Sequence, residues 1–432
     1  TISRYVVGHS GGLEGLSSGL WQEELRRFAL LVTFYRGSKM IVRIVFLIRL
    51  LCSFPLAFSL SSDAAVLLLR RSNLDVTVFP STGRGIQTLV DRDESDYLLK
   101  VPLNETVTAS NHFMGQKNLL EHLSEEQRLA VTLLHLKKHQ HSYINSVLPK
   151  KFFGVWSLSQ EEWAGQPFSL LPRCYRETLQ ASRNMAFDFS SSIDAEHPLE
   201  EALWALSMVR SRSIAVPELA EFEGHVPLAL IPGLDLFNHQ FDSGTVLELT
   251  QDQHWTLTSR KPYKAGEQVF LSYGDDKDNW KLLLTYGFAV PNNPNMVAFW
   301  TWEDLLDAAS TVRPGMFSDR VRRSLLMHPQ LQLYVSLSEE RATFSLDTKT
   351  KLPRDSLQNG LTMLSSLATQ LGFPHDDLLE RDLLRVLIEK RVDELRKCLE
   401  GFNKNKFQDP EWLPFLSSLE LTLREEFSLL AT

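Results

Sequence analysis

The sequence predicts an α+β protein in which a small β unit, interrupted by helices, precedes a helical C-terminal part. Short runs with strand-like alternation lie before residue 110 and again between residues 226 and 273. The stretch between these runs, and the whole sequence after Trp302, carry apolar residues at helical spacing. No segment repeats at a fixed period.

The globular part is expected to begin near residue 62. Ser62 and Asp63 can cap a helix, and residues 76–79 alternate like a strand. Residues 83–90 are expected to form a turn and a strand, and residues 97–102 a second strand after an acidic turn. We expect these two strands to pair as a β-hairpin.

Residues 117–213 are expected to be mostly helical, with the clearest helix over residues 199–209. After Trp302 the spacing predicts helices alone. Strand character returns between these two parts, at residues 226–231, 245–249, 255–259 and 268–273.

This order predicts three parts. An N-terminal extension covers residues 1–61, an α+β domain covers residues 62–300 with a helical insert at about 110–215, and a helical domain covers residues 301–432. A chain cut near residue 300 is then expected to keep the α+β domain folded.

The extension contains a possible targeting segment. Met40 opens a stretch with two arginines, followed by the apolar run Leu50–Leu60 and an Ala57-Phe58 step. This pattern is typical of a secretory signal or of the first half of an algal bipartite plastid signal, and it predicts plastid or secretory-route targeting. The alternative is an ordinary N-terminal helix on a cytoplasmic protein, because Arg49 divides the apolar stretch. No run of about 18 uncharged apolar residues is present, so no stable membrane span is expected.

Charge and cysteine content argue against two classes of site. The net charge of −8 disfavours an electrostatic grip on nucleic acid. Cys52, Cys174 and Cys398 lie far apart, and no histidine occurs in an HExxH motif. We therefore expect no disulfide framework and no metal site.

Two later motifs carry the functional signal. An apolar run ends in Asn238-His239, which can present hydrogen-bonding groups to a ligand that has both an amine and a carboxylate. A second apolar strand ends in Tyr273-Gly274, where the glycine lets a ligand approach the backbone beside the phenol. A dinucleotide-dependent oxidoreductase is poorly supported, because Gly83-Arg84-Gly85 does not extend into a GxGxxG turn that opens a helix.

Taken together, these motifs resemble the SET-domain protein methyltransferases of the subfamily that includes the Rubisco large-subunit lysine methyltransferase and the actin-histidine methyltransferase. The resemblance covers about residues 62–290. It is carried by Gly83-Arg84-Gly85, Val101-Pro102, Trp204 to Arg212, Asp235 to His239, Gly266-Glu267, Tyr273-Gly274, Asn279 and Tyr286-Gly287-Phe288.

The resemblance implies a SET-type β fold with a helical insertion, followed by an all-α substrate-binding domain like that of the Rubisco methyltransferase. It implies an S-adenosylmethionine-dependent protein-lysine N-methyltransferase that acts on a non-histone protein. The partner would be a protein that presents a lysine or a histidine. The oligomeric state is not predicted.

The resemblance also implies the site residues. Tyr273 would be the catalytic residue that orients the amine, and Tyr286 would line the substrate channel. Arg212 would meet the cofactor's carboxylate, although a cation at a helix C-terminus is an alternative role. The cofactor-binding residues would be Asp96 and Leu98, through their backbone, together with Arg212, Asp235, Asn238, His239 and Phe288.

Two alternatives stay open at the level of sequence. The target could be histidine, since the subfamily uses one scaffold for both residues. The chain could instead be a catalytically silent binding module, although an intact Asn238, His239 and Tyr273 argue against that. A Gln-Phe-Asp run at residues 240–242 departs from many relatives. Flanking cysteine-rich segments are absent, which is normal for this subfamily and weakens a histone assignment.

Overall fold

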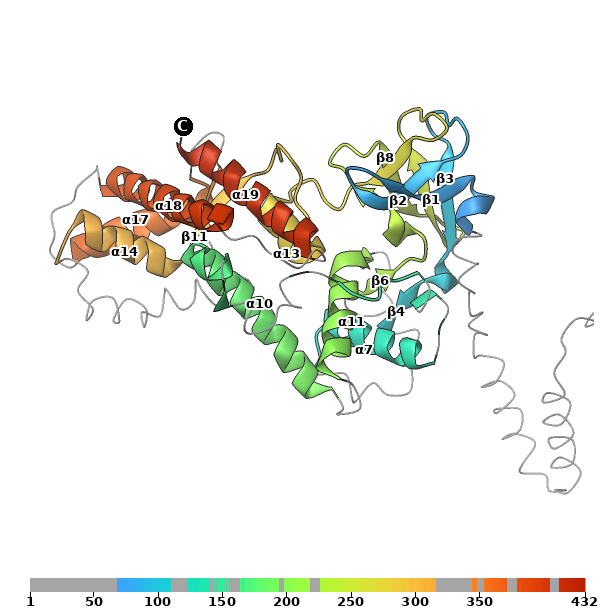
Figure 1. Ribbon diagram of the computed structural model, residues 1–432, viewed down its shortest axis with the longest axis horizontal. Helices are drawn as coiled ribbons and strands as arrows, with labels where there is room; N and C mark the ends of the chain where they lie inside the picture. The colour runs from blue at the N-terminus through green and yellow to red at the C-terminus, as the bar shows by residue number, and fades with distance from the viewer. Residues whose placement is uncertain are drawn as a thin grey trace, which may run out of the picture. The chain divides into compact units, whose positions relative to one another are not determined.

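The computed structural model describes residues 68–431 apart from several gaps (Figure 1). The N-terminal extension expected over residues 1–61, its targeting segment and the Ser62-Asp63 cap lie outside the described residues. Within the chain, Ser59–Thr432 forms one unit. The gaps fall at residues 110–122, 140, 142, 145–146, 153, 155–163, 166, 194–197, 218–225, 316–343, 348–352, 371–378 and 405–411.

The first sheet joins strands from distant parts of the sequence. β1 is rich in β-branched residues and turns back on β2, so that Phe79 pairs with Gly83. β10 lies antiparallel to β2 and parallel to β7, which brings Asn238 beside Phe270. The order is β1 (Leu74–Phe79), β2 (Gly83–Thr88), β10 (Gln268–Leu271) and β7 (Asn238–His239).

The hairpin predicted between residues 83–90 and 97–102 is wrong. Both strands form, but β2 pairs with β1, whereas β3 (Tyr97–Pro102) pairs with β9 (His254–Ser259). The acidic turn between them therefore joins two different sheets. Strand alternation shows where a strand runs but carries no information about its partner.

Two further sheets complete the β part. The second has the order β3-β9-β8, with β8 over Thr245–Leu249 as predicted. The predicted strand at residues 226–231 is confirmed with shorter ends as β6. The third sheet has the order β4 (Val107–Thr108), β6 (Leu228–Leu230) and β5 (Ile214–Ala215).

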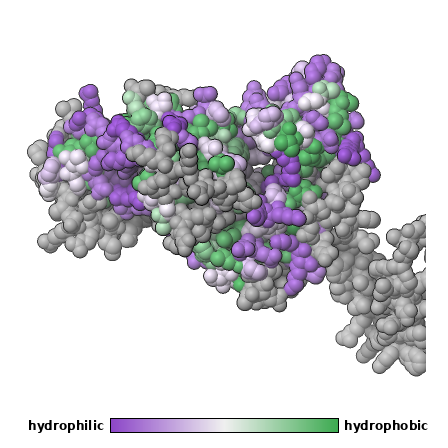
Figure 2. All heavy atoms as spheres, viewed as in Figure 1, coloured by the Kyte–Doolittle hydropathy of each residue, from purple (hydrophilic) through white to green (hydrophobic). Residues whose placement is uncertain are grey.

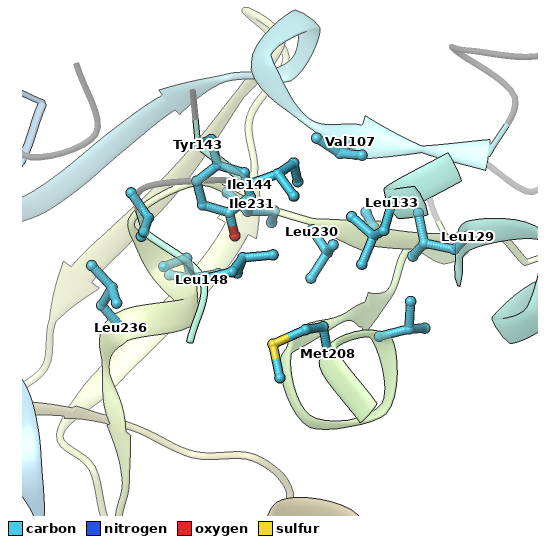
Figure 3. Close-up of a cluster of buried hydrophobic side chains, with 14 of the residues drawn as sticks. Val107, Leu129, Leu133, Tyr143, Ile144, Leu148, Met208, Leu230, Ile231 and Leu236 are labelled. Atoms are coloured by element: carbon cyan, nitrogen blue, oxygen red, sulfur yellow. The ribbon is translucent and has the colours of Figure 1, made fainter. Parts of the chain in front are cut away.

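Helices fill the predicted insert and bury one face against these strands. α7 begins at a capping box in which the Ser124 hydroxyl accepts from the Gln127 N–H and the Gln127 side chain accepts from the Ser124 N–H. Figure 3 shows apolar side chains of α7, α11, β4 and β6 meeting in one buried cluster. The helices of this part are α7 (Glu125–Lys138), α10 (Arg173–Ser192) and α11 (Leu199–Arg212), with the short 3-10 turns η1 (Leu103–Glu105) and η3 (Phe168–Leu170).

The described residues of the C-terminal part are helical as predicted, apart from a strand that the spacing did not indicate. β12 (Phe344–Asp347) pairs antiparallel with β11 (Val297–Trp300), so Trp300 lies opposite Phe344. Four residues are too few to leave a periodic signal. The helices are α14 (Trp302–Val312), α17 (Asp355–Gln370), α18 (Leu379–Lys404) and α19 (Leu413–Ala431).

Among these helices α18 is the most polar. Figure 2 shows hydrophilic residues gathered over it, while Leu383, Leu387 and Leu395 are buried on its inner side. Among the described residues, no helix combines the length and the apolar character needed to cross a membrane.

The hydrophobic core of the C-terminal helices extends into the part expected to be a separate domain. It includes Tyr175 near the start of α10, and Trp280 and Leu283 of α13 (Asn279–Tyr286). The end of α10, at Ala186 and Phe189, belongs to the core of the β part. α10 therefore packs into both cores along its length.

Candidate functional site

Two adjoining cavities open between α11, β10 and α13. The first has a volume of about 340 Å³ and the second about 150 Å³. They share five lining residues, and Tyr273 and Tyr286 are among them. Besides the shared Ser211, Arg212, Asp235, Tyr273 and Tyr286, the first is lined by Ser213, Ile214, Ala215, Ile231, Leu234, Leu271, Ser272 and Lys277, and the second by Arg84, Phe152, Leu236, Asn238 and Phe288.

Asn238 ties β7 to the start of β2. Its Nδ2 donates to the carbonyl oxygens of Thr82 at 3.3 Å and Arg84 at 3.1 Å. The backbone at Gly85 lies so close that a Cβ there would stand 2.6 Å from Nδ2 of Asn238. Glycine at 85 is therefore what permits this amide to reach the β2 backbone.

His239 lies behind the cavities and holds the backbone of Tyr273. Its Nδ1 accepts the Tyr273 N–H at 3.1 Å, so this nitrogen carries no proton. The imidazole is buried and stacks on the Tyr273 ring with centroids 5.2 Å apart. Burial lowers the pKa of His239, and the nearby positive charge of Lys277 acts in the same direction. A neutral imidazole is what the hydrogen bond requires.

Tyr273 directs its phenol toward a backbone carbonyl. The hydroxyl donates to the Phe237 carbonyl oxygen at 2.7 Å, which leaves the oxygen's lone pairs available to accept. Burial raises the pKa of Tyr273, so the phenol keeps its proton at neutral pH. The Tyr286 ring lies 4.7 Å from that of Tyr273, and burial raises the pKa of Tyr286 to about 12.

The wall of the smaller cavity carries more positive than negative charge. Arg212 Nη1 donates to Asp235 Oδ2 at 3.1 Å and to the Asp235 carbonyl at 2.8 Å. Arg84 is close enough that burial, and then the charge of Arg212, lower its pKa. Two guanidinium groups thus face one carboxylate. The Arg212 Nε is buried and has no hydrogen-bond partner among the described residues. Both features suit an anionic ligand such as a carboxylate.

The structure brings most of the predicted site residues together. Asn238, Arg212, Asp235, Tyr273, Tyr286 and Phe288 all line one or both cavities. His239 supports the site through the Tyr273 backbone and does not line either cavity.

Asp96 and Leu98 do not line either of the two cavities. Asp96 closes the turn before β3, where its Oδ2 accepts the Asp93 N–H at 2.9 Å. The Leu98 side chain is fully buried in the apolar core. β3 pairs with β9, whereas the cavities adjoin β2, β7 and β10, and a contact between the Asp96 or Leu98 backbone and a cofactor stays a prediction.

Residues at the start of the preceding strand, β2, do lie at the cavities. Arg84 lines the second cavity, and the Thr82 and Arg84 carbonyls receive the Asn238 amide. In the sequence these residues were marked by the Gly83-Arg84-Gly85 motif, because glycines on both sides of Arg84 allow another group to approach the backbone closely. Phe152, Ser211 and Lys277 also line the cavities, and nothing in their local sequence indicated it.

Within the part of the chain that the structure describes, no three His, Cys, Asp or Glu side chains are grouped so that they could hold a metal ion. The two described cysteines, Cys174 and Cys398, are buried and unpaired.

No family model matches this chain, but single proteins and solved structures are similar to it. SET domain-containing protein 4 of Artemia parthenogenetica is 26% identical over 78% of this chain and 87% of its own length. The ribosomal lysine N-methyltransferase set11 of Schizosaccharomyces pombe is 28% identical over 52% of this chain, which spans 58% of that protein. The actin-histidine N-methyltransferase of Drosophila melanogaster is 26% identical over 51% of this chain and 46% of its own length.

Solved structures with the same fold cover most of the chain. The SET domain of LSMT bound to lysine and AdoHcy matches with a TM-score of 0.57 at 17% identity, over 87% of this chain and 92% of that one. Rubisco LSMT bound to AdoMet matches with a TM-score of 0.54 at 17% identity, over 85% and 91%. At this identity the likeness establishes the fold.

Proposed function

We propose that this chain is a SET-domain protein methyltransferase, which transfers a methyl group from S-adenosylmethionine to a lysine of a non-histone protein. One observation carries the proposal: two cavities of different character meet at Tyr273. Apart from the residues that they share, the smaller one adds Arg84 and the aromatic rings of Phe152 and Phe288, and the larger one adds a wall that is mostly apolar, with Lys277 beside it. Such a pair can hold a cofactor and a target side chain from two sides of one reacting point.

The smaller cavity suits the cofactor. The surplus guanidinium charge of Arg84 and Arg212 and the unpartnered Arg212 Nε fit a carboxylate, and Phe288 offers an aromatic face to a planar ring. Asn238 holds the β2 backbone at the rim. S-adenosylmethionine, when bound, supplies an electrophilic methyl group on a sulfonium.

Tyr273 would position the target amine without removing its proton. Its hydroxyl proton is already donated to the Phe237 carbonyl, so the oxygen can accept an N–H from the amine. Because burial raises the pKa of Tyr273, the phenol is not a base at neutral pH. Alignment of the nucleophile, and exclusion of water, would then account for its contribution.

The larger cavity would favour the neutral amine. Ile214, Leu271 and Tyr286 give it an apolar wall, which disfavours an ammonium. Lys277 lines the same cavity and adds a positive charge. Both effects lower the pKa of a lysine that enters, and an unprotonated lysine is the nucleophile that the reaction needs.

Histidine is the second candidate target. Actin-histidine N-methyltransferases are among the relatives, and the one from Drosophila melanogaster aligns with half of this chain. An imidazole is largely neutral at pH 7 and needs no help to lose a proton. The lining of the larger cavity suits either side chain.

Methyl transfer from labelled S-adenosylmethionine tests the function. Full-length protein would be incubated with ribosomal proteins, Rubisco large subunit, actin and a protein extract of the source organism, and labelled proteins would be hydrolysed for amino-acid analysis. We expect label in methyl-lysine, and far less of it with Tyr273→Phe. Label in methylhistidine would favour the second candidate, and no transfer to any protein would contradict both.

Two further parts of the proposal concern regions outside the site. We propose that helices α14 to α19 provide the surface that binds the protein substrate, as the family resemblance implies. We also propose that residues 40–60 direct the protein to a plastid or the secretory route. A fluorescent fusion and N-terminal sequencing test this targeting, and a diffuse cytosolic protein that retains residues 40–57 would exclude it.

A further inference from the structure

The helix that carries Tyr286 is short and is fixed at both of its ends. α13 has eight residues from Asn279 to Tyr286, and its C-cap Gly287 has a positive φ of 80°. Glycine adopts this conformation without strain, so the chain reverses there and Phe288 follows directly. The positions of the Tyr286 and Phe288 rings therefore depend on what holds α13 and the returning loop.

Asn279 holds the two together. Its side chain is fully buried. Its Oδ1 accepts the Val290 N–H and one Asn293 amide proton, both at 2.9 Å. Its Nδ2 donates to the Val290 carbonyl at 3.0 Å and to Glu425 Oε2 at 3.1 Å. All four hydrogen bonds that an asparagine side chain can make are used.

Glu425 of α19 completes this arrangement from the C-terminal helices. Its Oε2 accepts from Asn279 and its Oε1 accepts the Asn292 N–H at 2.6 Å. One carboxylate thus binds the first residue of α13 and the loop that returns from Phe288. Hydrogen bonds to a charged acceptor are stronger than neutral ones, so the contact resists displacement of either segment.

We propose that Glu425 is a positioning residue, by which α19 sets the Tyr286 and Phe288 rings at the two cavities through Asn279. This inference rests on the proposed function for its consequence, since both rings line the cavities assigned to cofactor and target. The C-terminal helices would then shape the catalytic site directly, in addition to any role in binding the protein substrate.

Glu425 can be changed without leaving a charge buried, unlike its neighbour. Glu426 is fully buried, and its carboxylate binds Arg391 at 3.1 Å and the Trp280 Nε1 at 3.0 Å. Removing it would disrupt the core itself. Glu425 is half-buried, so its variants are expected to remain folded. Glu420 provides the control on the same helix, since it pairs with Arg424 one turn away at 2.6 Å.

The test compares Glu425→Ala, Glu425→Gln and Glu420→Gln in the full-length protein. In wild type each Glu425 oxygen accepts one hydrogen bond, from Asn279 or from the Asn292 N–H. Glutamine keeps only one acceptor oxygen, so the Glu425→Gln protein should behave between wild type and Glu425→Ala. We expect the Kd for S-adenosylhomocysteine, measured by calorimetry, to rise by about five- to tenfold in Glu425→Ala, because a mobile α13 lowers the binding-competent fraction. Glu420→Gln should match wild type, and all melting temperatures should lie within a few degrees.

A second readout does not depend on the proposed function. In protein labelled with fluorotyrosine, the Tyr286 resonance is assigned by its loss in Tyr286→Phe. It should shift or broaden in Glu425→Ala and stay unchanged in Glu420→Gln. An unchanged Tyr286 resonance in Glu425→Ala would overturn the inference, as would an unchanged Kd. Wild-type protein that fails to bind S-adenosylhomocysteine while this resonance still moves would contradict the proposed function and support the positioning role.

Discussion

At the scale of single residues, Tyr273 makes two separate contributions, one through its ring and one through its hydroxyl. It contacts the Phe237 carbonyl at 2.7 Å, and its ring packs between His239 and Tyr286. The ring contributes to packing, whereas the oxygen is available for the target amine. The two contributions can therefore be separated by removing the oxygen alone.

Tyr273→Phe keeps the ring and removes the acceptor. We expect the affinity for S-adenosylhomocysteine to stay within about twofold of wild type, and turnover on a protein substrate to fall by a factor of ~10². Calorimetry and initial rates measure the two effects. Full turnover in the variant would show that the phenol oxygen has no part in aligning the amine.

His239 predicts a specific pH dependence. Its folded-state pKa lies below the ordinary value of 6.5 because burial disfavours the imidazolium. As pH falls through 6.5, the unfolded chain takes up the proton first, so stability falls with it. The stability that neutral His239 contributes is fully present above pH 6.5, and it is lost as the pH falls to the folded-state pKa of His239.

The comparison is with His239→Gln, whose side-chain oxygen can still accept the Tyr273 N–H. Wild type should lose melting temperature and cofactor affinity more steeply than this variant between pH 7 and pH 5. Equal slopes in the two proteins would mean that another group controls the acid limb.

The sequence identified Asn238, Tyr273 and Tyr286 because each lies in or beside a short motif at the end of an apolar run. It did not show that β2, and not β3, lies beside β10, because the local pattern of a strand does not specify its partner. Phe152 and Lys277 had no local signal. Their place at the cavities comes from tertiary packing.

At the scale of elements, strand positions were predictable and strand partners were not. β8 and β9 form within a residue of the expected bounds, because alternation and turn residues are local. The parallel pairing of β7 with β10 joins segments that are about thirty residues apart, and it is what places Asn238 near Tyr273. The hydrophobic pattern alone does not predict that β7 and β10 pair.

α10 and α13 also determine whether the parts of the chain are separable. Trp280 and Tyr175 stack with centroids 3.6 Å apart, inside the core formed by the C-terminal helices. The expectation that a chain cut near residue 300 keeps a folded α+β domain does not agree with this packing. The cut would expose both rings and remove Glu426, to which the Tyr175 hydroxyl and the Trp280 Nε1 donate hydrogen bonds.

We expect a chain truncated after Trp300 to be insoluble or to lack a cooperative thermal transition. Losing the packing of one buried aromatic side chain costs about 3–5 kcal/mol, and two or three such losses reach the whole stability of a typical domain. Circular dichroism during heating measures the transition. A truncated protein that melts cooperatively and binds S-adenosylhomocysteine like the full-length chain would contradict a shared core.

At the scale of the whole molecule, two hydrophobic cores and one catalytic site depend on each other. The site lies on the β part, but α19 holds α13 through Glu425 and Glu426. The net charge of −8 agrees with a partner recognised through a cavity and a shaped surface more than through broad positive charge. Substrate recognition and catalysis are therefore expected to require the full chain.

The central claim is that the cavity beside Asn238 binds S-adenosylmethionine, and calorimetric titration of S-adenosylhomocysteine tests it most directly. Asn238→Ala removes the bonds to the Thr82 and Arg84 carbonyls and serves as the paired variant. The account predicts a micromolar Kd for wild type, about −8 kcal/mol, and binding at least ~10-fold weaker for the variant. No heat with wild-type protein at millimolar ligand, or equal affinity in the two proteins, would contradict it.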